Sequence, residues 1–156
     1  MSRIHVPIVL RWADLDAYGH VNNATMLRLL EEARIQVFWA DRHRPDAPAT
    51  ALLDNGEHAD TLSLIGRQEI EYLAPVPYLR RPIDVQLWVS RLGGASLEVD
   101  YEVWSPEGDP DPVLYARAAT TVVLVHPETG APRRITPAER AAWEAHMDAP
   151  LEFRRR

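Results

Sequence analysis

The alternation of apolar and polar positions predicts a strand, a long helix and an extended loop in the first half of the chain. Every second residue over 4–12 is apolar, the pattern of a half-buried strand: Ile4, Val6, Ile8, Leu10 and Trp12. Residues 26–42 carry apolar side chains over more than one narrow stripe, which predicts a helix covered by other structure on most sides. Residues 41–61 are rich in Pro, Asp, Ala and His and predict a long loop.

The second half of the chain predicts a sheet followed by a short helix. The strands are expected over residues 66–73, 83–92, 97–103 and 113–125. Short turns such as Gly93-Gly94 make neighbouring strands antiparallel. Thr136-Pro137-Ala138-Glu139 supplies an N-cap, a first-turn proline and a capping-box glutamate, which together predict a helix start. The predicted class is α+β, because a sheet and an unusually apolar helix bury each other most economically.

Composition and charge narrow the class of protein. The 156 residues are 46% hydrophobic and 26% charged, which predicts one globular domain over residues 1–156. The net charge of −6 argues against a nucleic-acid partner, which a basic face would bind. The absence of cysteine excludes disulfides, thiolate nucleophiles and zinc–thiolate sites. No signal peptide or membrane-spanning run is recognised, so we expect a cytoplasmic protein with no membrane partner.

The densest polar chemistry stands immediately before the long helix, in the ten residues DLDAYGHVNN over 14–23. Taken singly, each has an ordinary explanation: aspartates favour turns, an asparagine caps a helix, and glycine permits a positive φ. Together they lie where a helix start offers unpaired backbone N–H groups and a partial positive charge. Such a start polarises a carbonyl oxygen, and a carboxylate just upstream attacks that carbonyl or activates water beside it. The combination predicts an acyl-transfer site that needs no serine–histidine pair.

This motif resembles that of the hotdog-fold acyl-CoA thioesterases related to 4-hydroxybenzoyl-CoA thioesterase, and also that of plant acyl-carrier-protein thioesterases. Weaker similarities follow along nearly the whole chain: EEAR at 31–34, EIEYLAPV at 69–76, and the later stretches ATTVVLV and TGAPRRIT. The resemblance implies a hotdog fold, in which an antiparallel β-sheet wraps around a long central helix. It also implies hydrolysis of an acyl-CoA or acyl-ACP thioester, with coenzyme A as part of the substrate and no separate cofactor.

The resemblance assigns roles position by position. It makes Asp16 the catalytic carboxylate, as nucleophile or general base, and places the oxyanion amide on the backbone at Asn23. His20 either orients the thioester or supports the turn. Substrate is expected against Tyr18, Gly19, Val21, Asn22 and Met26. Two departures concern the substrate: many relatives carry an aromatic residue where Met26 stands, and the plant enzymes carry asparagine where Tyr18 stands.

A second carboxylate competes with Asp16 for the chemical role. In another branch of the hotdog family the acting acid lies further along the central helix, where Glu31 stands in this chain. The ordinary explanation of Glu31 is a helical acid paired with Arg28 or Arg34, so Asp16 is preferred.

Other polar residues leave two interpretations open. Arg80, Arg81 and Arg91 flank a strand hairpin, where they either contact the phosphates of coenzyme A or are solvated charges. Asp14, Asp16 and His20 are acceptable metal ligands, but no second histidine stands close by, so no metal site is expected.

Three functional classes follow from these residues. A thioesterase is preferred, and the alternatives are a hotdog dehydratase or hydratase and a non-catalytic acyl-CoA-binding module. The dehydratase alternative requires an aspartate and a histidine at a different spacing. The resemblance implies a homodimer or homotetramer with each site built from two subunits. Trp88 and Trp104 lie opposite the aliphatic rows of their strands, which predicts a covered second face of the sheet.

Overall fold

The computed structural model describes residues 3–154 and has an antiparallel sheet as its centre. The order of the strands across the sheet is β1-β3-β4-β5-β2, and every neighbouring pair is antiparallel. The strands are β1 (Ile4–Ile8), β2 (Leu62–Tyr72), β3 (Ile83–Leu92), β4 (Ser96–Trp104) and β5 (Leu114–Val125). The α+β class predicted from the sequence is confirmed. The expected domain limits at residues 1 and 156 lie outside the described residues.

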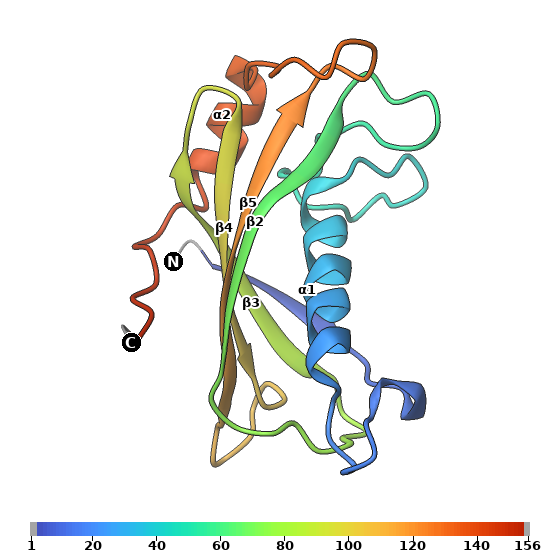
Figure 1. Ribbon diagram of the computed structural model, residues 1–156, viewed down its shortest axis with the longest axis vertical. Helices are drawn as coiled ribbons and strands as arrows, with labels where there is room; N and C mark the ends of the chain where they lie inside the picture. The colour runs from blue at the N-terminus through green and yellow to red at the C-terminus, as the bar shows by residue number, and fades with distance from the viewer. Residues whose placement is uncertain (1–2, 155–156) are drawn as a thin grey trace.

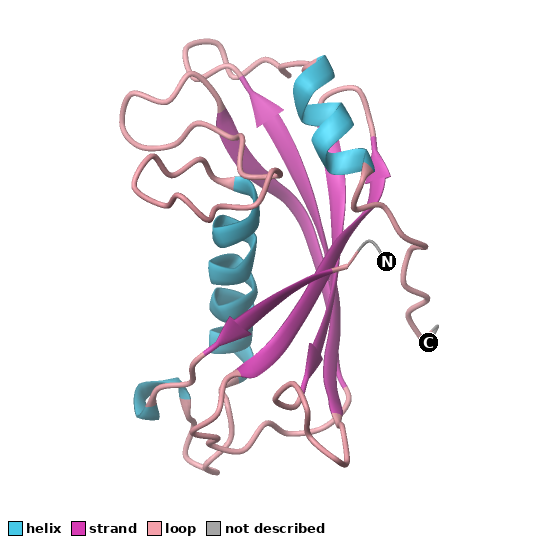
Figure 2. Cartoon of the chain, turned by 180° about the vertical axis from the view of Figure 1, so that it is seen from behind, coloured by secondary structure: helices cyan, strands magenta, loops and turns pink. Residues whose placement is uncertain are grey.

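The long helix α1 (Asn23–Phe38) runs along one face of this sheet (Figure 1). Its inward residues are fully buried, among them Leu30 and Ala33, each 0% exposed. They meet apolar residues from the facing side of the sheet: Val85, Leu87, Val99, Tyr101 and Val103. This interface forms most of the core and holds the first turn of α1 at one end of the sheet (Figure 2).

The first strand is shorter than its sequence pattern predicts. It ends at Ile8, and a short 3-10 helix, η1 (Trp12–Asp14), follows. The Asp14 carboxylate accepts a bond of 2.7 Å from the Arg11 amide, which turns the chain out of the sheet. Trp12, expected on the buried face, is 75% exposed in consequence.

The bounds of other elements differ by a few residues from expectation. α1 begins at Asn23 and ends at Phe38, whereas the apolar pattern predicts a helix over residues 26–42. β2 begins at Leu62, before the predicted start at residue 66, and its pairing with β5 shifts between Ile65 and Arg67. β3 has the predicted bounds.

The second face of the sheet, on the side away from α1, is covered at Trp88 as predicted. The residues that cover it belong to the same chain. Trp88 is 1% exposed, and its indole Nε1 donates to the carbonyl of Ala149 at 3.0 Å. The Arg3 guanidinium lies 3.9 Å from the ring centre. The burial of Trp88 therefore needs no partner subunit.

A short helix, α2 (Pro137–Glu144), closes the end of the core beyond the last turn of α1. Trp143 is fully buried and packs edge-on against Phe38, with ring centres 5.9 Å apart. The predicted capping box is present, because Thr136 and Glu139 each accept the other's backbone N–H. Glu139 also accepts from Arg133 Nη2 at 2.9 Å. Within residues 3–154 no helix is long and apolar enough to cross a membrane.

The Arg133–Glu139 pair predicts a pH-dependent stability. Burial raises the pKa of Glu139, but the bonds from Arg133 and Thr136 outweigh it, so the pKa lies below the usual 4.5. A carboxyl group whose folded-state pKa is lowered stabilises the fold above about pH 4.5, and this contribution is lost as the pH falls through the lowered value. We expect Glu139→Gln to reduce the free energy of unfolding by about 2 kcal/mol at pH 7, and by progressively less as the pH falls from 4.5 through the lowered pKa of Glu139.

Urea unfolding across this pH range checks the expectation, with Glu144→Gln on the exposed end of α2 as the control. An equal loss of stability for Glu139→Gln at all pH values would contradict the role of the charge.

Candidate active site

The motif of residues 14–23 forms a small loop that its own backbone closes. The amide of Asn22 donates to the carbonyl of Asp14 at 2.9 Å, so the two ends of the loop are joined directly in front of α1. Inside the loop, the Asp16 amide donates to the His20 carbonyl at 2.8 Å, and the Gly19 amide donates to the Asp16 carbonyl at 3.1 Å. Gly19 has a φ of 78°, a conformation that glycine adopts without strain. The loop therefore sets Asp16 opposite His20, three residues before α1 begins.

Asp14 anchors this loop and is 1% exposed. Its carboxylate accepts the Arg11 amide and, at 3.1 Å, Arg11 Nη2. Its carbonyl accepts the Asn22 amide. Its amide donates to the Arg11 carbonyl, so the polar groups of Asp14 are buried and hydrogen-bonded within the fold.

Asp16 is half-buried, and only one of its carboxylate oxygens is occupied. Oδ1 accepts the amides of Tyr18 at 2.8 Å and His20 at 3.3 Å. Oδ2 has no hydrogen bond in the described part of the chain. The turn thus fixes the direction of the carboxylate through one oxygen and leaves the other for a reacting group.

The start of α1 likewise uses some of its amides and leaves one. The side chain of Asn22 is the N-cap, and its Oδ1 accepts the amides of Ala24 at 2.9 Å and Thr25 at 3.1 Å. The amide of Asn23 has no acceptor among residues 3–154. One backbone donor, at the positive end of the helix dipole, therefore remains for a ligand oxygen.

An apolar pocket of about 280 Å³ adjoins this helix start. Val21 and Met26 line it, as do Tyr72, Val76 and Tyr115 from the sheet side. The Tyr72 hydroxyl donates to the Asn23 carbonyl at 2.6 Å, and burial raises the pKa of Tyr72 above its usual 10.0. The sequence motif did not reveal Tyr72 or Tyr115, because strands from the second half of the chain bring them to the helix.

Of the remaining residues expected at the site, the structure brings some to the loop and leaves one far from it. Tyr18 is 84% exposed beside the loop. His20 contacts Asp16 through its backbone, and no hydrogen bond of its imidazole is found within residues 3–154. Arg91 lies near the end of β3, and the other end of that strand, Ile83, pairs with Ile8 just before the motif. Eight strand residues span about 26 Å, so the structure does not bring Arg91 to the motif within one chain.

Glu31, the competing carboxylate, lies eight residues beyond Asn23, about 12 Å along the helix. Its carboxylate is 57% exposed and lies 3.8 Å from Arg34 Nη2. Of the two partners expected for it, Arg34 is the one found.

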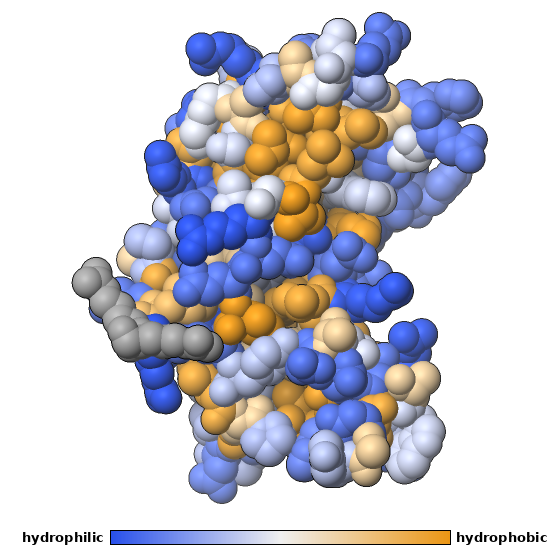
Figure 3. Space-filling view, in the orientation of Figure 1, coloured by the Kyte–Doolittle hydropathy of each residue, from blue (hydrophilic) through white to orange (hydrophobic). Residues whose placement is uncertain are grey.

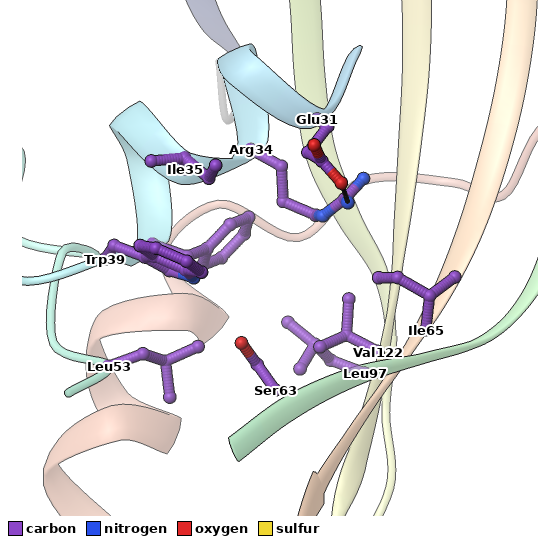
Figure 4. A pocket seen from close by; sticks show the side chains of 10 residues that line it. Glu31, Arg34, Ile35, Trp39, Leu53, Ser63, Ile65, Leu97 and Val122 are labelled. Carbon is purple, nitrogen blue, oxygen red and sulfur yellow. Dashed lines mark ion pairs between the residues drawn. The ribbon is translucent and has the colours of Figure 1, made fainter. Parts of the chain in front are cut away.

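Glu31 and Arg34 border a second cavity, of about 210 Å³, between α1 and the sheet (Figure 4). Its other walls are Ser63 and apolar side chains of α1, the loop after it, and strands β2, β4 and β5: Ile35, Phe38, Trp39, Leu53, Ile65, Leu97 and Val122. This cavity was not predicted from the sequence. A signal was present, because Arg34 lies four residues after Leu30 and three before Val37, on the buried face of the helix.

No group of three or more potential metal ligands occurs among residues 3–154.

Comparison with known proteins finds relatives over most of the chain. A family model described as the thioesterase-like superfamily matches residues 10–151. The chain is 29% identical over 124 residues to YsmA of Bacillus subtilis (strain 168). The matched segment covers 79% of this chain and 73% of YsmA. The PA5185 protein of Pseudomonas aeruginosa superposes with a TM-score of 0.74 at 24% identity, over 95% of this chain and 94% of that one. A Thermus thermophilus thioesterase complexed with coenzyme A and Zn gives a TM-score of 0.65 at 27% identity, over 91% and 92%.

The two adjacent asparagines offer a matched test of the helix start. Asn22→Ala removes both capping bonds and is expected to lower the free energy of unfolding by about 1 kcal/mol. Asn23→Ala keeps the backbone amide and removes an exposed side chain, so its stability is expected to equal that of the wild type. Urea unfolding of both variants measures the difference. Equal losses, or a larger loss for Asn23→Ala, would contradict the assignment of Asn22 as the cap.

Proposed function

The chain belongs to the thioesterase-like superfamily, and from that membership we propose that it hydrolyses an acyl-CoA thioester at the start of α1. One observation carries the proposal: the loop closed in front of α1 holds a carboxylate with a free oxygen, Asp16 Oδ2, and the helix start that follows it has a free amide, Asn23 N–H. The apolar pocket formed in part by Val21 and Met26 adjoins them and offers space for the acyl group. The hotdog arrangement, with the sheet curved around α1, is part of this proposal.

The chemistry uses the two free groups together. The thioester carbonyl oxygen accepts the Asn23 amide, and the helix dipole stabilises the negative charge that develops on it. Asp16 either removes a proton from water as the water attacks the carbonyl carbon, or attacks that carbon itself and is released by water in a second step. In both cases the carbon–sulfur bond breaks, the thiol leaves with a proton, and water supplies the oxygen of the free acid.

Coenzyme A is the proposed carrier, with an acyl-carrier protein as the alternative. The solved Thermus thioesterase holds coenzyme A, and its structure resembles this chain over most of its length. Coenzyme A leaves as product, so the proposed reaction requires no separate cofactor. A dehydratase requires an aspartate and a histidine at a different spacing, and the His20 imidazole makes no hydrogen bond to Asp16 within residues 3–154. The binding-module alternative predicts tight binding of an acyl-CoA without release of thiol.

We also propose that two copies pair through β2. This strand is at the edge of the sheet, is 11 residues long, and leaves one row of backbone groups unpaired. Leu62, Leu64 and Ile65 on it are 38–50% exposed. Apolar atoms gather on the face that the molecule presents in Figure 3, where β2 lies in front. An exposed apolar edge strand pairs readily with a second copy, and an isologous dimer satisfies both edges.

Asp16→Asn tests the catalytic assignment. The asparagine keeps an oxygen that accepts the Tyr18 and His20 amides, so the loop is expected to stay closed while the nucleophile or base is lost. We expect thiol release from an acyl-CoA panel to fall by ~100-fold or more, with unchanged thermal unfolding. Glu32→Gln, on the exposed side of α1, is the control and is expected to keep full activity. Loss of activity in Glu31→Gln, with Asp16→Asn active, would transfer the catalytic role to Glu31.

The dimer is tested by charge on the edge strand. A symmetric interface places each substitution in the assembly twice, so Leu64→Lys is expected to convert the dimer to a monomer. Sedimentation velocity measures the mass of both forms. Leu52→Lys, at an equally accessible leucine in the loop after α1, is expected to remain dimeric. A monomeric wild type, or a dimeric Leu64→Lys, would contradict pairing through β2.

A further inference from the structure

The cavity between α1 and the sheet contains a charge that the surrounding protein only partly compensates. Arg34 is 8% exposed, and an arginine buried to this extent normally has a close anionic partner. Its Nη1 donates to the hydroxyl of Tyr101 at 3.1 Å, which is a neutral acceptor. Its one carboxylate neighbour, Glu31, lies 3.8 Å away, beyond hydrogen-bond distance. A guanidinium has five N–H donors, so most of them have no protein acceptor within residues 3–154.

The unused donors border the apolar cavity of about 210 Å³. Figure 4 shows Arg34 at one end of this cavity, with Trp39, Leu53 and Ser63 around the other. Apolar cavities of ~150 Å³ hold a benzene molecule, so this one has room for a short hydrocarbon chain or a single ring. The cavity therefore combines a hydrophobic body with one cationic end.

We propose that this cavity is a binding site for an apolar carboxylate, which places its carboxylate on Arg34 and its hydrocarbon part against Trp39, Leu53 and Val122. Arginine suits this role because its planar fork binds a carboxylate through two parallel bonds. Within one chain the site is separate from the Asp16 loop, because Arg34 lies eleven residues beyond Asn23, about 16 Å along the helix.

Glu31 acts as a competitor for the ligand. Its carboxylate is at the mouth of the same cavity and is attached to Arg34 only loosely. An incoming carboxylate takes the closer position on the guanidinium, and the exposed Glu31 side chain turns to solvent. Removing the charge of Glu31 is therefore expected to strengthen binding, an effect opposite to that of removing Arg34.

Isothermal titration calorimetry with hexanoate and the neutral hexanamide tests the site in the native oligomer. We expect the wild type to prefer hexanoate by ~10-fold or more, since a hydrogen-bonded charge contributes at least that much. Arg34→Gln should remove the preference, and Glu31→Gln should tighten hexanoate binding several-fold. Arg28→Gln, on the exposed side of the same helix, should bind as the wild type does. Ser63→Leu fills the cavity and should weaken both ligands.

Equal affinity of the wild type for the acid and the amide would overturn the proposal. Retained preference in Arg34→Gln, or weaker hexanoate binding in Glu31→Gln, would do the same. If Arg34→Gln does not fold, the opposite directions expected for Glu31→Gln and Ser63→Leu still decide. These titrations involve no hydrolysis, so their failure and the failure of the proposed thioesterase activity are separate results.

The carboxylate has two possible sources, a free acid or the far end of a thioester substrate. Hydrolysis of dodecanoyl-CoA and dodecanedioyl-CoA distinguishes them, because only the second carries a terminal carboxylate. A preference for dodecanedioyl-CoA that Arg34→Gln abolishes identifies the substrate as the source. Equal hydrolysis, together with hexanoate binding, supports the site as one for free acids.

Discussion

The hydrogen bond between the Asp14 carbonyl and the Asn22 amide is the constraint on which the candidate active site depends. It joins the two ends of a loop whose residues would otherwise diverge, and it does so one residue before the first turn of α1. Asp14 is buried and held by Arg11, while Asn22 caps the helix, so both partners are fixed from outside the loop. This closure positions the loop before α1, while the Oδ1 bonds of Asp16 and the cap of Asn22 leave Asp16 Oδ2 and the Asn23 amide unused.

The second constraint is the burial of one face of α1 against the sheet. Leu30 and Val37 lie on that face for ordinary packing reasons, and Arg34 lies between them. Placing a charge there costs free energy unless an anion is close, and Glu31 is both too far and too exposed to serve fully. One helix thus presents a free amide at its first residue and an underpaired guanidinium eleven residues later. The first accounts for the proposed hydrolysis and the second for the proposed carboxylate site.

Local patterns along the chain predicted local features well. The bounds of β3 were correct, because strict alternation ends at the Gly93-Gly94 turn. The residues of the proposed site at the helix start lie within ten consecutive positions, so a local motif was enough to suggest them. The alternation that continues to Trp12 was misleading, since the Asp14 carboxylate ends the strand by capturing the Arg11 amide. Arg91 was expected either at the phosphates of coenzyme A or as a solvated charge, and the alternation of a strand does not say which end of the sheet meets the helix start. The cavity at Arg34 was missed because Leu53, Ser63 and Val122 come together only in the folded chain.

The central claim is that a substrate carbonyl binds the Asn23 amide, and amide NMR tests this most directly. The ligand is an acyl-CoA analogue in which a methylene group replaces the thioester sulfur, so the carbonyl is kept and hydrolysis is prevented. On titration, the Asn23 amide proton should move strongly downfield as it gains an acceptor. The Ala24 and Thr25 amides should change little, because Asn22 already holds them. Saturable binding with an unchanged Asn23 resonance would contradict the account.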